Sequence, residues 1–115
     1  MTHKTFKRKL LIDLDGVLNE YTGNYEENVI PPIKRGAKEF LEKCFEENYE
    51  IKIFTTRNRL RTTKWLIDNG LDKVISDVTN VKEPAYLYID DRCILFNGDF
   101  NKTLQQIDSF KVHWK

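Results

Sequence analysis

Two aspartates stand two residues apart at the end of an apolar run, in the stretch LLIDLDGVL of residues 10–18. Aspartate is depleted in β-strands, and two neighbouring negative charges repel one another. In an extended segment Asp13 and Asp15 point to the same side, and Gly16 lets the chain turn sharply after them. The pair therefore either marks an ordinary strand-to-turn junction or belongs to a site that needs negative charge.

Two further apolar runs end in residues that could share such a site. Thr55, Thr56 and Arg57 follow IKIF, and Asp90 and Asp91 follow AYLYI. If these runs are parallel strands of one sheet, four carboxylates and several hydroxyls converge at one edge. Close carboxylates raise each other's pKa, and a hard divalent cation such as Mg²⁺, which takes oxygen ligands, relieves the repulsion. Turns and caps explain one acidic pair well, whereas two pairs at matching strand ends favour a metal site.

The elements that must position these residues alternate along the chain. Runs rich in β-formers predict strands, and apolar residues at helical spacing predict helices. The expected strands span 10–14, 49–57, 73–78, 85–90 and 93–96, and the expected helices span 33–48, 60–69 and 101–108. This alternation predicts an α/β fold, a three-layer sandwich whose mostly parallel, Rossmann-like sheet is covered by helices on both faces. In such folds the binding crevice lies at the carboxyl ends of the strands.

The motifs that end these strands resemble the signatures of the haloacid-dehalogenase-like (HAD) phosphohydrolases. LLIDLDGVL is similar to the first signature, and IKIFTTR, an apolar strand closing on Thr, is similar to the second. Lys82 in VKEPAYLYIDDR resembles the third signature, and IDD in the same stretch resembles the fourth. All four follow the family's order over residues 10–92. The resemblance implies a HAD-like fold and an enzyme, an Mg²⁺-dependent phosphatase that hydrolyses phosphomonoesters through an aspartyl-phosphate.

The resemblance also implies a role for each matching residue. Asp13 is the expected nucleophile that attacks phosphorus, and Asp15 is the expected general acid and base. Thr55 is expected to hydrogen-bond a phosphoryl oxygen. Lys82 is expected to offset the negative charge of Asp13 and of the phosphoryl group.

The position of the lysine is left open by the sequence. Only residues 83–89 separate Lys82 from the acidic pair, without the helix that many family members have there. A subgroup of small family members with a similarly short spacing supports Lys82, and Lys64 is the alternative.

For the metal, the resemblance implies a ligand set of Asp13, Asp15 through its backbone carbonyl, and the second acidic pair. Asp91 is the expected direct ligand, with Asp90 orienting the lysine or the waters on the metal, although the choice between the two remains open. The family often has a further supporting Asp three or four residues after the pair, where this chain has Ile and Leu.

Gly16, Thr56 and Arg57 are the expected substrate-binding residues. The guanidinium of Arg57 suits a bidentate contact with an anionic group of the substrate. The basic residues that follow it, Arg59, Arg61 and Lys64, could extend this contact or form a solvated helix face.

The intervals between the signatures are filled by the expected loop, helices and strands, and leave no room for a cap domain. Residues 1–115 are therefore predicted to form a single domain without a cap, in which loop 19–32 is a possible flap. Tyr21 and Tyr25 of this loop could stack on a base or sugar, or pack on their own loop. An open crevice admits large substrates, and the phosphorylated substrate is expected among small molecules, sugars, nucleotides and oligonucleotide ends.

Composition limits the remaining function classes. The 115 residues carry a net charge of +1, so bulk electrostatics give no argument for nucleic acid or membrane binding. No apolar run approaches the length of a membrane span, and no signal peptide is recognisable. Cys44 and Cys93 lack metal-ligand spacing and are expected to be buried, reduced thiols, which favours a cytoplasmic protein. The oligomeric state is not predicted.

Three other functions stay open at this point. IDDR resembles the matching stretch of polynucleotide 3′-phosphatase domains, which would make the substrate a nucleotide or polynucleotide. A phosphoacceptor module resembling response-regulator receivers also combines acids, Mg²⁺, Thr and Lys on a doubly wound sheet. A catalytically weak phosphate-binding protein would keep the same site, and the missing extra Asp gives this possibility weight.

Overall fold

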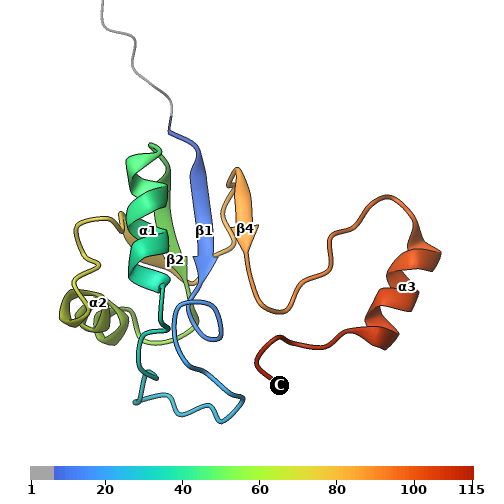
Figure 1. Ribbon diagram of the computed structural model, residues 1–115, viewed down its shortest axis with the longest axis horizontal. Coiled ribbons are helices and arrows are strands. Elements are labelled where there is room, and N and C mark those ends of the chain that lie inside the picture. Colours follow the sequence, from blue (N-terminus) through green and yellow to red (C-terminus); the bar gives the residue numbers. More distant parts are fainter. Residues whose placement is uncertain (1–6) are drawn as a thin grey trace, which may run out of the picture.

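The computed structural model describes residues 7–115, which contain four strands and three helices. In chain order these elements are β1 (Lys9–Asp13), α1 (Ala37–Glu46), β2 (Glu50–Phe54), α2 (Arg59–Asp68), β3 (Asp77–Thr79), β4 (Leu87–Ile89) and α3 (Phe100–Ser109), as labelled in Figure 1.

The strands form one parallel sheet in the order β3-β2-β1-β4. The central strand β1 pairs with β2 over its whole length and with β4 from Leu10 to Ile12. A 3-2-1-4 order is that of Rossmann-like sheets, in which β2 and β3 are added on one side of β1 and the next strand is added on its other side. Because every pair is parallel, all four carboxyl ends lie at one edge. The predicted α/β class, with a parallel Rossmann-like sheet and no cap domain, is confirmed.

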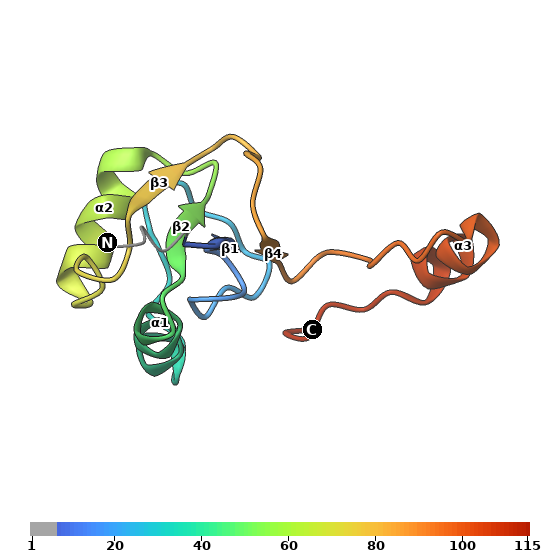
Figure 2. The same cartoon turned by 90° about the horizontal axis from the view of Figure 1, so that it is seen from above.

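The hydrophobic core lies between this sheet and the helices α1 and α2, which cover the same face (Figure 2). Strand residues alternate between the two faces, so every second apolar residue points toward the helices. The buried cluster includes Leu10, Ile12, Ile51 and Ile53 of the strands and Leu41 and Leu66 of the helices. Each such side chain stabilises the fold by about 1.5–3 kcal/mol through burial.

The opposite face of the sheet carries charged residues rather than a helix. The ammonium groups of Lys9 in β1 and Lys52 in β2 lie 2.7 and 2.9 Å from Glu83 Oε1. Glu83 belongs to the segment between β3 and β4, which passes over this face in Figure 2. The prediction of helices on both faces is therefore correct for one face only. On the other face, Lys9 and Lys52 bind Glu83 of the segment between β3 and β4, and this segment lies where a helix was expected.

Several bounds differ from the sequence prediction for local reasons. α1 starts at Ala37 and not at 33, since Gly36 has φ 89, a left-handed conformation that does not continue into a helix. Ile33 instead forms an isolated antiparallel bridge with Asn19, which closes the loop after β1. Residues 93–96, expected as a fifth strand, form none, so the outer edge of β4 is unpaired within residues 7–115.

The helix α3 projects from the rest of the molecule (Figures 1 and 2). Phe100, Leu104 and Ile107 recur on one of its faces, yet they are 77%, 60% and 56% exposed. Among the described elements, none packs against α3. The radius of gyration of 15.7 Å accordingly exceeds the value of about 13 Å typical of a domain of this size.

Two further expectations concern the surroundings of the chain. Within residues 7–115, no helix has the length and hydropathy needed to cross a membrane. Both cysteines are free thiols. Cys44 is half-buried against the core, whereas Cys93 is exposed because residues 93–96 leave the sheet, so the expectation of a buried thiol is wrong there.

Candidate functional site

Three carboxylates meet where β1 and β4 end. Asp13 is the last residue of β1, and Asp90 and Asp91 directly follow β4. The two strands are adjacent and parallel, with Ile12 opposite Ile89, so their ends reach the same edge of the sheet. One carboxylate oxygen from each acid lies within 4.8 Å of the others. The structure thus brings together three of the four acids that the sequence singles out.

Asp13 lies in a setting that disfavours its charge. Burial raises the pKa of Asp13 to about 8, and the negative charges of Asp90 and Asp91 add to the rise. A hydrogen bond with Asp91 and the charge of Asp15 act in the same direction. With no cation bound, the Asp13 carboxyl therefore keeps a proton at neutral pH.

Asp91 shows the opposite shift. Burial acts to raise its pKa, but hydrogen bonds from several donors outweigh burial, and the pKa of Asp91 falls below its usual value. The largest of these contributions comes from the indole of Trp114, and Asp90 and Asp13 add to it. The shared proton accordingly resides on Asp13 and the negative charge on Asp91.

The donor set of this cluster fits a hard divalent cation. It consists of carboxylate oxygens, which Mg²⁺ prefers, and not of the cysteine and histidine ligands typical of zinc. Among the described residues, no lysine or arginine forms an ion pair with any of the three acids. A bound cation would lower the pKa of Asp13 and relieve the repulsion between the carboxylates.

The side chain of Asp15 is turned to a different set of partners. Arg57 Nε lies 2.9 Å from Asp15 Oδ2 and 3.2 Å from Oδ1. Asn19 Nδ2 donates to Oδ1 at 2.9 Å. Both carboxylate oxygens accept hydrogen bonds from these donors, and the side chain of Asp15 is not part of the cluster formed by Asp13, Asp90 and Asp91.

Arg57 connects Asp15 to the loop 19–32. Its side chain is buried, and Nη1 donates to the backbone carbonyls of Glu26 and Glu27 at 2.7 and 3.1 Å. The guanidinium also lies over the ring of Tyr25, 4.5 Å from its centroid. These contacts leave only the buried Nη2 without a protein partner. The structure thus places Arg57 as an anchor of the flap and of Asp15, where the sequence predicted a substrate contact.

Asn19 is a site residue that the sequence reasoning missed. It is fully buried. Its Oδ1 accepts hydrogen bonds from the backbone N–H groups of Gly16 and Tyr21 at 3.1 and 3.2 Å, while its Nδ2 holds Asp15. Gly16 has φ +85, so the sharp turn expected after Asp15 is present. An asparagine three residues after the glycine of a tight turn was the available signal, since such side chains bond to nearby backbone.

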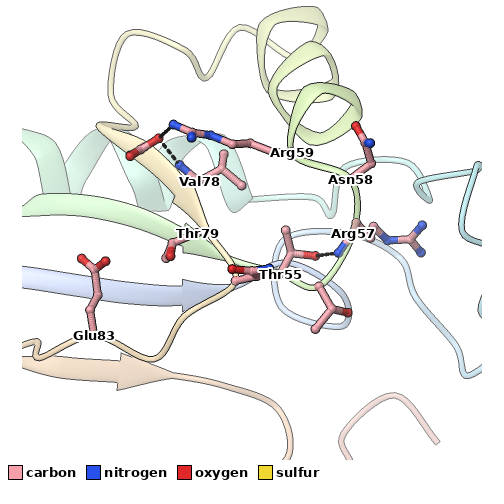
Figure 3. Close-up of a pocket in the computed structure, with 10 residues that line it drawn as sticks. Thr55, Arg57, Asn58, Arg59, Val78, Thr79 and Glu83 are labelled. Atoms are coloured by element: carbon pink, nitrogen blue, oxygen red, sulfur yellow. Dashed lines mark hydrogen bonds and ion pairs between the residues drawn. The ribbon is translucent and has the colours of Figure 1, made fainter.

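The threonines after β2 lie at a pocket of about 400 Å³ between the ends of β2 and β3 (Figure 3). Thr55 is buried, and its Oγ1 accepts a hydrogen bond from the backbone N–H of Arg57 at 3.1 Å. Thr56 is exposed and also lines the pocket. Hydroxyl and amide side chains of Thr79 and Asn80 face the same space. The pocket is polar and adjoins the strand end that carries Asp13, because Asp13 pairs with the residue before Thr55.

Neither candidate lysine reaches the acids. The ammonium of Lys82 lies over the ring of Tyr88, 4.9 Å from its centroid, and forms no ion pair in the described part of the chain. Lys64 pairs with Asp68 within α2 at 2.9 Å. The lysine position that the resemblance implies is thus unfilled by a direct contact.

The two flap tyrosines pack on protein groups. Tyr25 stacks on Arg57, as described above, and Tyr21 meets Trp114 edge-on, with ring centroids 5.3 Å apart. Both rings therefore pack on residues outside loop 19–32, and not on the loop itself as the second of the two sequence readings had it.

No family model and no curated protein matches the chain. Among solved structures, a conserved protein from Bacteroides thetaiotaomicron is similar with a TM-score of 0.60 and 19% identity, covering 93% of this chain and 94% of that one. An uncharacterized protein from Listeria monocytogenes serotype 4b has a TM-score of 0.49 and 17% identity, covering 88% of this chain and 61% of that one. The first similarity shows a shared fold.

Proposed function

We propose that the protein is a Mg²⁺-dependent phosphatase that hydrolyses a phosphomonoester through an aspartyl-phosphate on Asp13. The observation that carries the proposal is the cluster of Asp13, Asp90 and Asp91 at the carboxyl edge of a Rossmann-like sheet. The order of HAD-like signatures along the sequence supports the same function, since each signature ends at this edge or in the segment that leads to it.

In this mechanism Asp13 acts as the nucleophile. One of its carboxylate oxygens forms a bond to phosphorus while the bond between phosphorus and the leaving oxygen breaks. Asp13, Asp90 and Asp91 would hold Mg²⁺, whose positive charge would favour the carboxylate form of Asp13 and stabilise the phosphoryl oxygens. The raised pKa of Asp13 supports this assignment, because a strongly shifted group in a cluster of acids is a candidate for catalysis.

Asp15 acts as general acid in the first half of the reaction and as general base in the second. In its protonated form Asp15 first donates a proton to the leaving oxygen, and the proton taken up in the second half of the reaction restores that form. It then removes a proton from a water molecule as the water oxygen attacks phosphorus, which releases inorganic phosphate and frees the Asp13 carboxylate. Arg57 and Asn19 hold the two oxygens of Asp15, so the same side chain stays in place for both steps.

The pocket between β2 and β3 is the proposed place of the leaving group. Thr55 at its border is the candidate hydrogen-bond partner of a phosphoryl oxygen. The rest of the lining offers hydroxyl and amide groups together with charged side chains, which are those of Arg57, Arg59, Asp77 and Glu83. Such a lining suits a polar, hydroxyl-rich group such as a sugar or a nucleoside.

A second candidate is a phosphate-binding module with little turnover. It is favoured by Lys82, whose ammonium lies over Tyr88 and leaves the charge of the acids without a basic partner in the described residues. A receiver-like module is less well supported. Sheets of that type have the order 2-1-3-4-5, with β3 next to β1, whereas here β3 lies next to β2.

The proposal is tested by phosphate release from an aryl phosphate and from a 3′-phosphorylated oligonucleotide, with Mg²⁺ and with EDTA. We expect turnover that requires Mg²⁺ and falls at least about 1,000-fold in Asp13→Asn, because the nucleophile is then lost. The matched control is Asp68→Asn, an exposed acid of α2 that pairs with Lys64.

Turnover that survives Asp13→Asn would sink the proposal. Stable labelling of the protein by phosphate, without turnover, would instead support the binding-module alternative, and the label should then be absent from Asp13→Asn.

A further inference from the structure

The segment 110–115 returns from α3 toward the ends of β1 and β4 (Figure 1). His113 Nε2 lies 2.7 Å from the backbone carbonyl oxygen of Gly16. The indole N–H of Trp114 donates to Asp91 Oδ2 at 2.5 Å. Two consecutive residues thus touch the turn after β1 and the acid after β4, although they follow Asp91 by more than twenty positions.

The ring of Trp114 is packed on several sides by protein. Tyr21 meets it edge-on, at an interplanar angle of 77°. The guanidinium of Arg92 lies over it, 5.3 Å from the ring centroid. Gly23 approaches so closely that a Cβ added there would lie 3.3 Å from the ring. These neighbours hold the indole of Trp114 from several sides. Its position is fixed by the flap and by Arg92, and its N–H is directed at Asp91.

Gly16 shows how tightly this arrangement is built. A Cβ added to Gly16 would overlap Asp91 Oδ2 and would lie 2.8 Å from Trp114 Nε1. The turn after β1, the acid after β4 and the indole therefore converge on one point, and only glycine leaves room for the hydrogen bond between the last two.

The chemistry of the donor matters as much as its position. An indole N–H is a neutral donor with no acceptor capacity, so it orients a carboxylate oxygen without cancelling the negative charge. A lysine or arginine in the same place would neutralise Asp91 and compete with a cation. Metal ligands are commonly held by such neutral partners, whose removal costs about 10–100-fold in metal affinity.

We propose that Trp114 is a positioning residue that holds Asp91 in place for a divalent cation, with the flap residue Tyr21 and with Arg92 holding Trp114 in turn. The inference rests on the cation site of the proposed function but not on phosphatase turnover. It also assigns a role to the segment 110–115, which completes a site whose other residues all precede position 93.

The test measures cation binding directly, by calorimetric titration of the full chain with Mg²⁺ at pH 8. We expect Trp114→Phe, which removes the N–H and keeps an aromatic ring, to weaken Mg²⁺ binding by about tenfold. Trp114→His should stay within about threefold of the wild type, since imidazole Nε2 occupies the place of indole Nε1 in the five-membered ring and still donates.

The matched control is Trp65→Phe. Trp65 also donates its indole N–H, to the carbonyl oxygen of Pro31 at 3.2 Å, but it lies on α2 away from the acids. This variant should bind Mg²⁺ with the wild-type dissociation constant. It also leaves Trp114 as the one tryptophan of the chain, so Mg²⁺ should change the Trp114 fluorescence in a saturable manner, and Asp91→Asn should abolish that change.

The outcomes separate this inference from the proposed function. If Trp114→Phe binds Mg²⁺ as tightly as the wild type, the role of Trp114 is wrong, whether or not phosphate is released. If Trp114→Phe weakens binding while no phosphate ester is hydrolysed, the positioning role stands and the phosphatase proposal fails. If the wild type binds no Mg²⁺, both are overturned.

Discussion

Two aspartates separated by one residue, Asp13 and Asp15, lie in contrasting surroundings. Asp13 faces other carboxylates and keeps its proton, with a pKa of about 8 in the absence of a cation. Asp15 faces the guanidinium of Arg57 and the amide of Asn19. Environments that separate two neighbouring acids in this way are how a site assigns different chemical roles to the same residue type.

The raised pKa of Asp13 predicts a specific dependence of stability on pH. Between about pH 4 and about pH 8 the folded state holds a proton on Asp13 that the unfolded chain has released. The free energy of unfolding therefore falls as pH rises through this window. In EDTA we expect the wild type to lose about 1–3 kcal/mol between pH 5 and pH 8, measured by urea denaturation.

The variant Asp13→Asn should lack this loss and should be more stable than the wild type at pH 8. Excess Mg²⁺ should restore the wild type at pH 8 and have little effect at pH 5, because only the ionised cluster attracts the cation. Asp68→Asn serves again as the control. Parallel pH profiles for the wild type and Asp13→Asn would contradict the assignment of the proton to Asp13.

A second residue-level prediction concerns Arg57, whose contacts are with Asp15 and the flap. We expect Arg57→Met to lower kcat by about 100-fold, because Asp15 is then free to move, while KM changes less than about threefold. Arg57→Lys should recover little, since an ammonium cannot reach Asp15 and the carbonyls of Glu26 and Glu27 together. Steady-state kinetics with the aryl phosphate give both constants.

The control is Arg59→Met, an exposed arginine two positions away that pairs with Asp77. A rise in KM with unchanged kcat in Arg57→Met would instead indicate that Arg57 binds the substrate, as the sequence alone suggested.

At the level of helices and strands, the sequence predicted an element best where interactions between residues close in the chain are enough to form it. The helix predicted over 60–69 is observed as α2, and Asn58 caps its start by accepting from the backbone N–H of Arg61 at 3.0 Å, a contact between residues close in the chain. Residues 93–96 show the opposite case. Their composition suits a strand, but a strand exists only with a partner, and nothing local reveals that the outer edge of β4 is unpaired.

The same distinction applies to the site. Asp13, Asp90 and Asp91 were predictable because parallel strands bring their carboxyl ends to one edge. The partners of Arg57 and Asp91 were not, because they depend on backbone carbonyls of a loop and on an indole far along the chain. Contacts of this kind depend on tertiary packing. Hydrophobic periodicity predicts helices and strands but not which side chains meet between distant parts of the chain.

The projection of α3 predicts that helices of equal length contribute unequally to stability. Leu41 of α1 is fully buried, so Leu41→Ala should cost about 2–5 kcal/mol of unfolding free energy. Leu104 of α3 is 60% exposed, so Leu104→Ala should cost less than about 0.5 kcal/mol. Urea denaturation of the two variants measures both values. A cost for Leu104→Ala that approaches that of Leu41→Ala would mean that α3 packs on the protein in solution.

For the whole molecule, the arrangement of the site is asymmetric. The acids and the turn after β1 are built on the parallel sheet. The flap 19–32 reaches Asp15 through Asn19 and Arg57, and the segment 110–115 reaches Asp91 through Trp114. Each of these two outer segments is thus linked to one acid, the flap to Asp15 and the segment 110–115 to Asp91. The sheet sets the positions of the acidic residues, and hydrogen bonds from the outer segments fix the orientation of the Asp15 and Asp91 side chains.

Residues 93–112 leave the body of the protein just after Asp91 and return to it just before Trp114, which donates to Asp91. The segment that carries α3 therefore begins and ends near the same carboxylate. Doubling the length of such a loop raises the entropic cost of closing it by only about 0.6 kcal/mol. The segment 93–112 should therefore tolerate the insertion of a longer sequence. A peptide epitope inserted in place of α3 would leave the sheet intact, because no described helix or strand packs on α3. In a Trp65→Phe background, the fluorescence of Trp114 would report whether the segment 110–115 still reaches Asp91.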